Sequence, residues 1–399
     1  MSSIKPPKNS IVIFGCGISG MLTAIALSRA GIKSHVVEKK SLEELTYDQD
    51  IRTTALNQFS RNFFEKIDVW ARLEKYISSI NEIYVCQNKS DNIFKMEGSH
   101  FPLGYMIPNI DFKNSLIEII RNDPNIRLSC DSIYQNIQLS DYNISYDRVS
   151  GGSRFSEVAD LCIAADGKFS SLRGEFFTEF VQKDYRQTAI VFNIKHELSH
   201  DAGAIEHFLP RGSFATLPLV NRFESSIVWV EETDIASFYL SRSKNFLAKQ
   251  ISDFTGGSLG DIEIISRIES YPLSAFCSKE YYNKRLMLVA DSAHSIHPLA
   301  GQGLNMGIKD IESITSLIIK YNSLGLLGCA EMAKEYQRQR GLDNYMMFKI
   351  TDSINGIFTS KISFVNEMTK VGLSIINKAS FLQRLLIDYA KGKRSTLTS

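Results

Sequence analysis

The sequence predicts an α/β protein with an inserted β-rich domain and a C-terminal helical region. Three observations support this prediction. A strand–helix–strand pattern opens the chain at 11–38, short strand-like runs dominate 185–275, and 330–390 has mostly helical patterning. Short apolar runs at 161–165 and 286–290 are typical of buried parallel strands. We therefore expect these distant segments to complete the sheet that the first unit begins.

The first unit has the order of a Rossmann-like domain. Ile11–Phe14 is a β-branched apolar run, Ile18–Arg29 has apolar residues at helical spacing, and His35–Glu38 is a second strand. Amphipathic helices are expected over 57–78 and 111–121, and a further helix from about residue 303. This βαβ arrangement places the turn between the first strand and the first helix at the edge where such sheets bind ligands.

Three glycines occupy that turn. Gly15, Gly17 and Gly20 form G-x-G-x-x-G. The first permits a tight turn, the second lets a pyrophosphate approach the backbone, and the third allows close helix–strand packing. Glu38 follows at the end of the second strand, where its carboxylate can accept both hydroxyls of an adenosine ribose. Because that carboxylate would repel a 2′-phosphate, the motif predicts FAD or NAD rather than NADP.

The domain organisation follows from where the patterns change. The β-rich part is marked by apolar runs at 189–192, 226–230 and 262–265, with a turn at 210–212. We expect a nucleotide-binding domain in two parts, the first of which can contribute strands near 80–105 to the inserted substrate domain. The expected ranges are 1–184 and 276–340 for the two parts, 185–275 for the insertion and 341–399 for the helical region.

Three further blocks carry chemistry. They are D-x-R-x-x-A-L at Asp50–Leu56, D-G-x-x-S-x-x-R at Asp166–Arg173, and a long block at Ala290–Asp310. Asp291 follows an apolar strand, so its carboxylate can hold hydroxyls of a ribityl chain at the strand end. Gly303 opens a helix whose dipole can stabilise negative charge on a reduced ring.

The four ordered motifs resemble those of flavoprotein aromatic hydroxylases with the p-hydroxybenzoate hydroxylase fold, and within them the ubiquinone-biosynthesis hydroxylases of the UbiH/UbiI/UbiF type. The resemblance touches most of the chain. It has one departure, because the family usually begins the third block with Gly-Asp where this chain has Ala290 before its aspartate. The resemblance implies a set of FAD-binding residues: Gly15, Gly17, Gly20 and Glu38 for the ADP half, Arg52 near the flavin, Asp166, Asp291 for the ribityl–pyrophosphate region, and Gly301, Gly303 and Asn305 around the isoalloxazine.

The same resemblance implies a reaction. The expected activity is that of an FAD-dependent monooxygenase, which hydroxylates the aromatic ring of a polyprenylated phenol through a flavin C4a-hydroperoxide. O₂ is the co-substrate and NAD(P)H the implied electron donor. The cofactor carries this chemistry, so no catalytic side chain is singled out. The alternatives are a non-catalytic FAD-binding subunit of a quinone-biosynthesis complex, a hydroxylase of another small aromatic compound, and an NAD-dependent dehydrogenase.

Composition narrows the class of protein. The net charge of +1 across 399 residues argues against a nucleic-acid binder with a basic surface. The six cysteines include no C-x-x-C pair, which favours reduced thiols in the cytoplasm. An apolar stripe over 375–389, followed by Lys391, Lys393 and Arg394, suits the inner membrane surface. Alternatively, the stripe packs against the body of this protein or against a partner subunit.

One motif points to different chemistry. His196-Glu197-Leu198-Ser199-His200 matches H-E-x-x-H, and Gly203 and Glu206 extend it toward a zinc-protease pattern. That chemistry needs a helix, whereas a strand precedes the segment and Ser199, Asp201 and Gly203 disfavour a helix. We therefore expect a polar hairpin and no metal. His294 and His297 stay unassigned, since each could bind substrate or flavin or simply order its loop.

Overall fold

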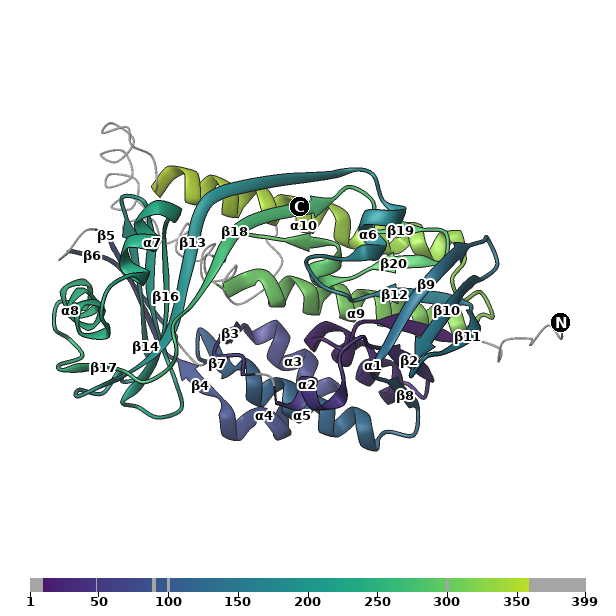
Figure 1. Ribbon diagram of the computed structural model, residues 1–399, viewed down its shortest axis with the longest axis horizontal. Helices are drawn as coiled ribbons and strands as arrows, with labels where there is room; N and C mark the ends of the chain where they lie inside the picture. Colours follow the sequence, from purple (N-terminus) through teal and green to yellow (C-terminus); the bar gives the residue numbers. More distant parts are fainter. Residues whose placement is uncertain (1–9, 48, 88–90, 99–100, 299–300, 359–399) are drawn as a thin grey trace.

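The computed structural model describes residues 10–358 except 48, 88–90, 99–100 and 299–300 (Figure 1). Its first sheet has six strands in the order β19-β20-β12-β1-β2-β8. Three strands that are far apart in sequence, β1 (Ile11–Phe14), β12 (Leu161–Ala164) and β20 (Leu286–Leu288), lie side by side and parallel. This confirms that distant segments complete the Rossmann-like sheet. The remaining strands are β2 (Ser34–Val37), β8 (Ile126–Ser129) and β19 (Tyr282–Asn283).

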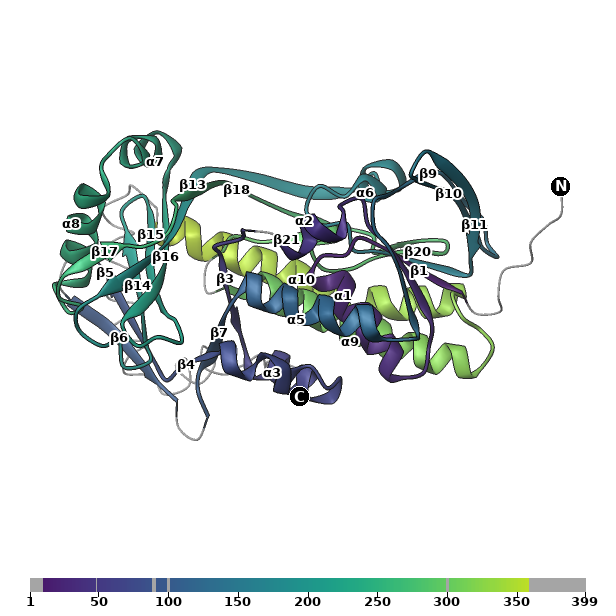
Figure 2. The ribbon, with the colours of Figure 1, turned by 60° about the horizontal axis from the view of Figure 1, so that its bottom comes forward.

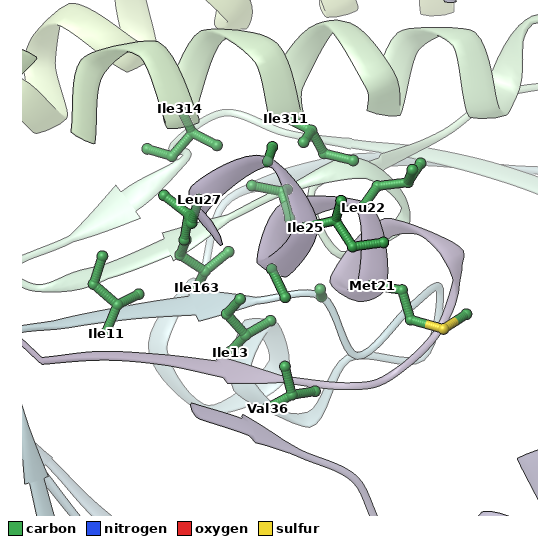
Figure 3. Packing of buried hydrophobic residues seen from close by; sticks show 14 of the residues in the cluster. Ile11, Ile13, Met21, Leu22, Ile25, Leu27, Val36, Ile163, Ile311 and Ile314 are labelled. Carbon is green, nitrogen blue, oxygen red and sulfur yellow. The ribbon is translucent and has the colours of Figure 1, made fainter. Parts of the chain in front are cut away.

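Helices cover one face of this sheet. Nine consecutive residues of α1 (Ile18–Arg29), from Gly20 to Ser28, are buried, because the helix lies between the sheet and α9 (Gln302–Ser323). Figure 3 shows Ile311 and Ile314 of α9 facing Leu22 and Ile25 of α1. The other helices of this domain are α2 (Leu42–Thr46), α3 (Gln58–Lys66), α4 (Trp70–Leu73), η1 (Glu74–Tyr76), α5 (Asn109–Asn122), α6 (Ser171–Phe176), η2 (Ala290–Ser292) and α10 (Ala330–Phe358).

A three-stranded antiparallel sheet covers the opposite face. It consists of β9 (Ser132–Leu139), β10 (Ile144–Ser150) and β11 (Ser153–Ala159). Phe14 of β1 packs against it, with ring centroids 4.1 Å from Tyr134 and 5.1 Å from Tyr146. This sheet was not among the elements predicted from the sequence. The Gly151-Gly152 pair, at positive φ in the turn between β10 and β11, was the local signal for a hairpin.

The inserted domain is built on a nine-stranded sheet with the path β21-β18-β13-β16-β15-β14-β5-β6, and β17 pairs with β13. Its strands are β5 (Glu82–Gln87), β6 (Asp91–Glu97), β13 (Phe180–His196), β14 (Gly203–Leu209), β15 (Gly212–Pro218), β16 (Glu224–Glu232), β17 (Ile262–Ile264), β18 (Glu269–Ser278) and β21 (His294–Ser295). Helices α7 (Thr233–Leu240) and α8 (Lys244–Thr255) cover the outer face (Figures 1 and 2). Their cluster includes Ile190, Trp229 and Ile251.

A small sheet joins the two domains. Its strand order is β3-β7-β4, with β3 (Thr53–Leu56), β7 (Gly104–Pro108) and β4 (Ser78–Ile80). Ile80 and Met106 of this sheet pack against Ala204 of β14. We use the term inner face for the side of the nine-stranded sheet that meets these residues, opposite α7 and α8 (Figure 2).

One helix prediction differs from the structure. The single helix expected over 57–78 is divided into α3, α4 and η1, because Asp68 takes a left-handed φ of 57°. Helix α10 crosses the predicted domain boundary at residue 341 without a break. The apolar stripe over 375–389 lies outside the described residues. Within the described part of the chain, no helix has the length and hydropathy to cross a membrane.

Candidate cofactor site

The glycine turn has separate structural reasons for its three glycines. Gly15 takes φ +103°, and a Cβ there would lie 2.5 Å from the carbonyl oxygen of Ala165. A Cβ on Gly20 would lie 2.0 Å from the carbonyl oxygen of Gly15. At Gly17, the residue before α1, a Cβ would meet no atom within 4 Å in the described part of the chain, its two chain neighbours aside. Gly17 therefore leaves open space at a helix N-terminus, which suits a phosphate.

Glu38 is held beside this turn. Its side chain is buried, with Oε2 accepting the N–H of Cys16 at 2.6 Å and Oε1 accepting the N–H of Lys40 at 2.9 Å. A carboxylate oxygen can accept more than one hydrogen bond. The carboxylate is thus oriented by two backbone groups and can still accept hydrogen bonds from the hydroxyls of a ribose.

Asp166 leaves one oxygen unpaired. Its Oδ2 accepts hydrogen bonds from the Tyr134 hydroxyl and the Ser171 N–H, both at 3.0 Å. Its Oδ1 is buried and has no hydrogen-bond partner among the described residues. Because an unpaired buried acceptor is costly, this atom indicates a donor that the protein chain itself does not supply. In the same block, Arg173 donates to the carbonyl oxygen of Ser292 at 2.8 Å and so joins it to the third block.

Arg52 is fixed between the two domains. Its guanidinium donates to both carboxylate oxygens of Asp50 at 2.7 Å and lies over the ring of Tyr271, 5.2 Å from its centroid. Burial works against ionisation of Asp50, but Arg52 and Lys113 outweigh it and hold the pKa of that carboxyl well below its usual range. Arg52 is therefore a charged, half-exposed group that touches the inner face of the nine-stranded sheet.

Asp291 lies where three of the blocks meet. Its side chain is exposed, in the turn that follows β20. Surrounding protein atoms raise the pKa of this carboxyl, and the positive charges of His294, Lys168 and Arg52 oppose that rise. The charges of the first, second and third blocks therefore act on one carboxylate, although they come from positions more than a hundred residues apart.

A buried ionic network supports the third block from behind. Asp310 accepts hydrogen bonds from Arg340 Nε at 2.7 Å, Asn344 Nδ2 at 2.9 Å and the Ala290 N–H at 3.0 Å, and His294 Nε2 lies 2.6 Å away. Burial opposes its charge, but the positive groups around it hold the pKa of Asp310 well below its usual range. The network ties α9 and α10 to the block. Sequence reasoning missed it, and it shows that His294 orders the loop.

The packing around Ala290 explains how this chain accommodates an alanine where the family usually has glycine. It takes φ +51°, a left-handed conformation that favours glycine. Its methyl group is buried, and a Cβ on Gly307 of α9 would lie only 2.6 Å from it. The missing side chain of Gly307 therefore provides the space for the methyl group. This methyl group points into the protein toward α9.

The start of α9 is held against β3. Gly301 takes φ +59°, and a Cβ there would lie 2.9 Å from the Cβ of Ala55. The amide of Asn305 donates to the carbonyl oxygens of Ala55 at 2.8 Å and Gly301 at 3.1 Å, and it accepts from the Asn57 N–H at 3.0 Å and the Ser60 hydroxyl at 2.7 Å. Asn305 thus acts on this region by positioning its backbone.

Space remains at Gly303. A Cβ on this residue, in the first turn of α9, would meet no atom of the described residues within 4 Å beyond its chain neighbours and the helix's own backbone. Gly17 and Gly303 therefore both border open space at helix N-termini. A ring that contacts backbone N–H groups would fit beside Gly303, as a pyrophosphate would fit beside Gly17.

His297 remains without an assigned role. Its Nε2 lies 3.1 Å from Gln187 Oε1, its ring packs edge-on against Tyr185, and its Nδ1 is buried with no hydrogen-bond partner among the described residues. Burial lowers the pKa of His297 to about 4. The imidazole is therefore neutral at physiological pH.

The H-E-x-x-H segment does not form a helix. β13 ends at His196, and the residues up to His200 form a loop. The expectation of a hairpin was wrong, because β13 and β14 are not paired with each other. His196 contacts the carbonyl oxygen of Leu198 at 2.7 Å and Ser225 Oγ at 3.0 Å. Over the described ranges, no group of three His, Cys, Asp or Glu side chains is placed to hold a metal.

These features fit FAD. Five features lie along one edge of the domain, at the carboxyl ends of its parallel strands: the open glycine turn, Glu38 beside it, the unpaired oxygen of Asp166, the exposed Asp291 and the space at Gly303. That edge is where open α/β sheets bind dinucleotides.

Known proteins are similar to this chain over nearly its whole length. Ubiquinone hydroxylase UbiL of Rhodospirillum rubrum is 29% identical over 388 residues, which cover 96% of this chain and 89% of the relative. Ubiquinone hydroxylase UbiM of Neisseria meningitidis is 26% identical over 399 residues, covering 96% and 85%. The crystal structure of p-nitrophenol 4-monooxygenase PnpA from Pseudomonas putida superposes with a TM-score of 0.81 and 18% identity, covering 98% of this chain and 100% of that one, which shows a shared fold.

The family assignment rests on a sequence model of the FAD binding domain. It matches residues 8–323, and so includes the glycine turn, all three further blocks and the nine-stranded sheet. Over those residues the sequence match and the geometry agree, and the chain belongs to the FAD binding domain family.

Proposed function

We propose that this protein is an FAD-dependent monooxygenase that hydroxylates the aromatic ring of a polyprenylated phenol in ubiquinone biosynthesis. The main support for this proposal is that four sequence blocks meet at one edge of the sheet. Arg52 of one block contacts Tyr271 on the inner face of the inserted domain. Relatives named as ubiquinone hydroxylases, which are similar in sequence over 85–89% of their own length, support the proposal.

In this proposal each described residue has a defined task. The N-terminus of α1 at Gly17 receives the pyrophosphate, and Glu38 accepts the adenosine ribose hydroxyls. Asp291 accepts ribityl hydroxyls, and Asp166 Oδ1 gains the donor that it lacks. Arg52 places a positive charge on the flavin side. When bound, FAD supplies the redox chemistry that activates O₂.

The start of α9 has a separate task. Gly303 leaves room for the isoalloxazine beside the helix N-terminus, whose partial positive charge stabilises negative charge on the ring. Gly301 and Asn305 hold that backbone in place. The electron donor in the proposal is NAD(P)H. Because the sequence has no second glycine fingerprint, we expect this donor to bind transiently or over the FAD domain.

The chemistry of the proposed substrate determines where the enzyme must bind it. Each buried CH₂ of a prenyl tail contributes about 0.8 kcal/mol, so the tail stays in a bilayer unless protein covers it. The proposal therefore includes contact with the inner membrane surface, with other proteins of the same route as partners. The basic, apolar C-terminal sequence at 375–394 supports such contact.

Two measurements test the proposal. Purified protein should be yellow and should consume NAD(P)H in an O₂-dependent way while a prenylated phenol gains one hydroxyl group, with an anaerobic reaction as the control. Cells that lack the protein should accumulate a prenylated precursor that is one hydroxyl group short. A colourless protein that releases no flavin on denaturation, or cells with unchanged quinone precursors, would contradict it.

The alternative of a non-catalytic FAD-binding subunit had one sequence hint, Ala290. Its methyl group is buried against Gly307 rather than exposed at the site. The structure therefore offers no observation that favours this alternative over turnover.

A further inference from the structure

The register of the nine-stranded sheet defines which side chains share its inner face. Residues that pair directly across antiparallel strands point to the same side. One row of such partners runs through Glu206, Ala215, Val228 and Val191 on β14, β15, β16 and β13. The neighbouring row is Phe208, Ser213, Val230, Ala189 and Tyr271.

Two contacts show that these rows face the cofactor site. Tyr271 lies under the guanidinium of Arg52. Ala204, two residues before Glu206 on β14, belongs to a hydrophobic cluster against which Ala55 packs. The Cβ of Ala55 lies next to Gly301, at the start of α9. The rows therefore lie between two points at which the inserted domain meets the flavin-side residues.

Glu206 is unusual in this position. Its immediate cross-strand partner is Ala215, and the row continues with valines, so a carboxyl group lies among apolar side chains. The side chain keeps partial contact with solvent. Burial raises its pKa to about 7, and the hydroxyl of Ser213 only partly offsets that rise. Among the interactions described for Glu206, its polar partner is the Ser213 hydroxyl, and no positively charged group offsets the burial of its carboxyl.

We propose that Glu206 accepts the proton of the phenol hydroxyl when the substrate ring lies between the inner face and the flavin side. This inference rests on the proposed function and names a catalytic residue for it. In the step, the phenol O–H bond breaks, the proton goes to a carboxylate oxygen of Glu206, and the electron pair stays on the phenol oxygen. The ring becomes more electron-rich at its ortho and para carbons, and Glu206 later returns the proton to solvent.

Other charged or titratable side chains on this face are farther along the strands or already paired. Glu269 pairs with Arg267 and with the Tyr271 hydroxyl, and Glu224 accepts from Asn221. The register also places on this face, at strand ends, Lys195 and Glu232. None of these groups is among the interactions that shift the pKa of Glu206, which are burial and the Ser213 hydroxyl.

The experiment uses the holoenzyme and two probes, 2-prenylphenol and its methyl ether. Binding is followed by the change in flavin absorbance between pH 5.5 and 9, in wild-type protein and in Glu206→Gln. A matched control is Glu263→Gln, an exposed carboxylate on β17 of the same domain. Flavin content and the urea midpoint of each protein show that the variants are folded.

Wild-type protein should prefer the phenol over the ether by about tenfold or more above pH 7, because a carboxylate is a strong acceptor for the hydroxyl. The preference should fall below pH 7 as Glu206 is protonated. Glu206→Gln should lose about tenfold of the preference and its pH dependence, whereas Glu263→Gln should keep both.

Two outcomes overturn the inference in different ways. If wild-type protein hydroxylates the phenol and Glu206→Gln keeps the same preference and pH profile, the role of Glu206 is wrong and the proposed function stands. If wild-type holoenzyme neither binds nor oxidises either probe, the proposed function fails and the inference fails with it.

Discussion

Replacing Asp310 with asparagine should weaken the contacts between the third sequence block and the two helices that support it, α9 and α10. The wild-type carboxylate accepts hydrogen bonds from Arg340, Asn344 and the Ala290 N–H and contacts His294, all of them buried. An asparagine in the same place offers one oxygen and one NH₂ group. Whichever way it is turned, the NH₂ group faces donors, and the guanidinium of Arg340 loses its fully buried counter-charge.

The expected loss in free energy of unfolding follows from the burial of this ion pair. Removing one partner of a buried ion pair costs about 3–5 kcal/mol, because the remaining charge is left uncompensated. Arg340 keeps only Asp343, which is 2.7 Å away but 46% exposed. A cost of about 3–5 kcal/mol corresponds to a loss of roughly 10²-fold to more than 10³-fold in the folding equilibrium. That is a large part of the 5–15 kcal/mol typical of a whole protein.

The assay is a urea titration at pH 7 in which release of flavin is followed by fluorescence, with the slope of each transition compared between proteins. Asp343→Asn is the matched control, since it removes the same chemistry from the same arginine at an exposed position and should cost at most about 1 kcal/mol. Asp310→Asn should also bind FAD more weakly, because the Ala290 N–H loses the acceptor that holds the strained turn before Asp291.

The pH dependence has a definite sign. The pKa of Asp310 is lower in the folded protein, so its stabilisation is complete above its unfolded pKa, about 3.9, and is lost as the pH falls through the folded value. The difference between wild-type and Asp310→Asn should therefore shrink below about pH 4. Equal urea midpoints for the variants at 310 and 343, with unchanged flavin retention, would refute the importance of this network.

Three further predictions concern the cofactor edge. Gly20→Ala should unfold or severely destabilise the first domain, since its Cβ would lie 2.0 Å from a backbone oxygen. Gly17→Ala should keep the stability of the apoprotein and lose FAD affinity. Equal melting temperatures of the two variant apoproteins would contradict this expectation. Gly307→Ala should cost about 1–3 kcal/mol through overpacking, and Ala290→Gly in the same chain should recover most of it in urea unfolding. Asp291→Ala should lower the flavin-to-protein absorbance ratio with an unchanged circular dichroism spectrum; an unchanged ratio would show that Asp291 does not hold FAD.

Much of the first domain was predictable because its signals are local. β1 and α1 have the predicted bounds, since a β-branched apolar run, three glycines and a helical apolar pattern each act within a few residues. The three-stranded sheet over 132–159 was missed because its strands alternate polar and apolar residues with modest contrast. The break at Asp68 was missed because a left-handed aspartate leaves no strong mark in the sequence.

The predicted site residues divide in a similar way. Gly15 and Gly20 are needed by the fold for reasons visible in the motif itself, a tight turn and close packing. Asn305 was predicted to line the isoalloxazine, but its amide is occupied by four protein hydrogen bonds, which no spacing rule reveals. Glu206 appeared in the sequence only as part of a misleading zinc motif.

The sequence by itself determined the Rossmann-like unit, the glycine turn and the family resemblance, because turn geometry and helix initiation depend on neighbouring residues. Only the tertiary structure decided which distant groups meet: the charges around Asp291, the network of Asp310, and the position of Glu206 on the inner face. Strand register and domain packing bring these groups together. Both depend on contacts between residues far apart in the chain, and one sequence read alone does not contain their distances.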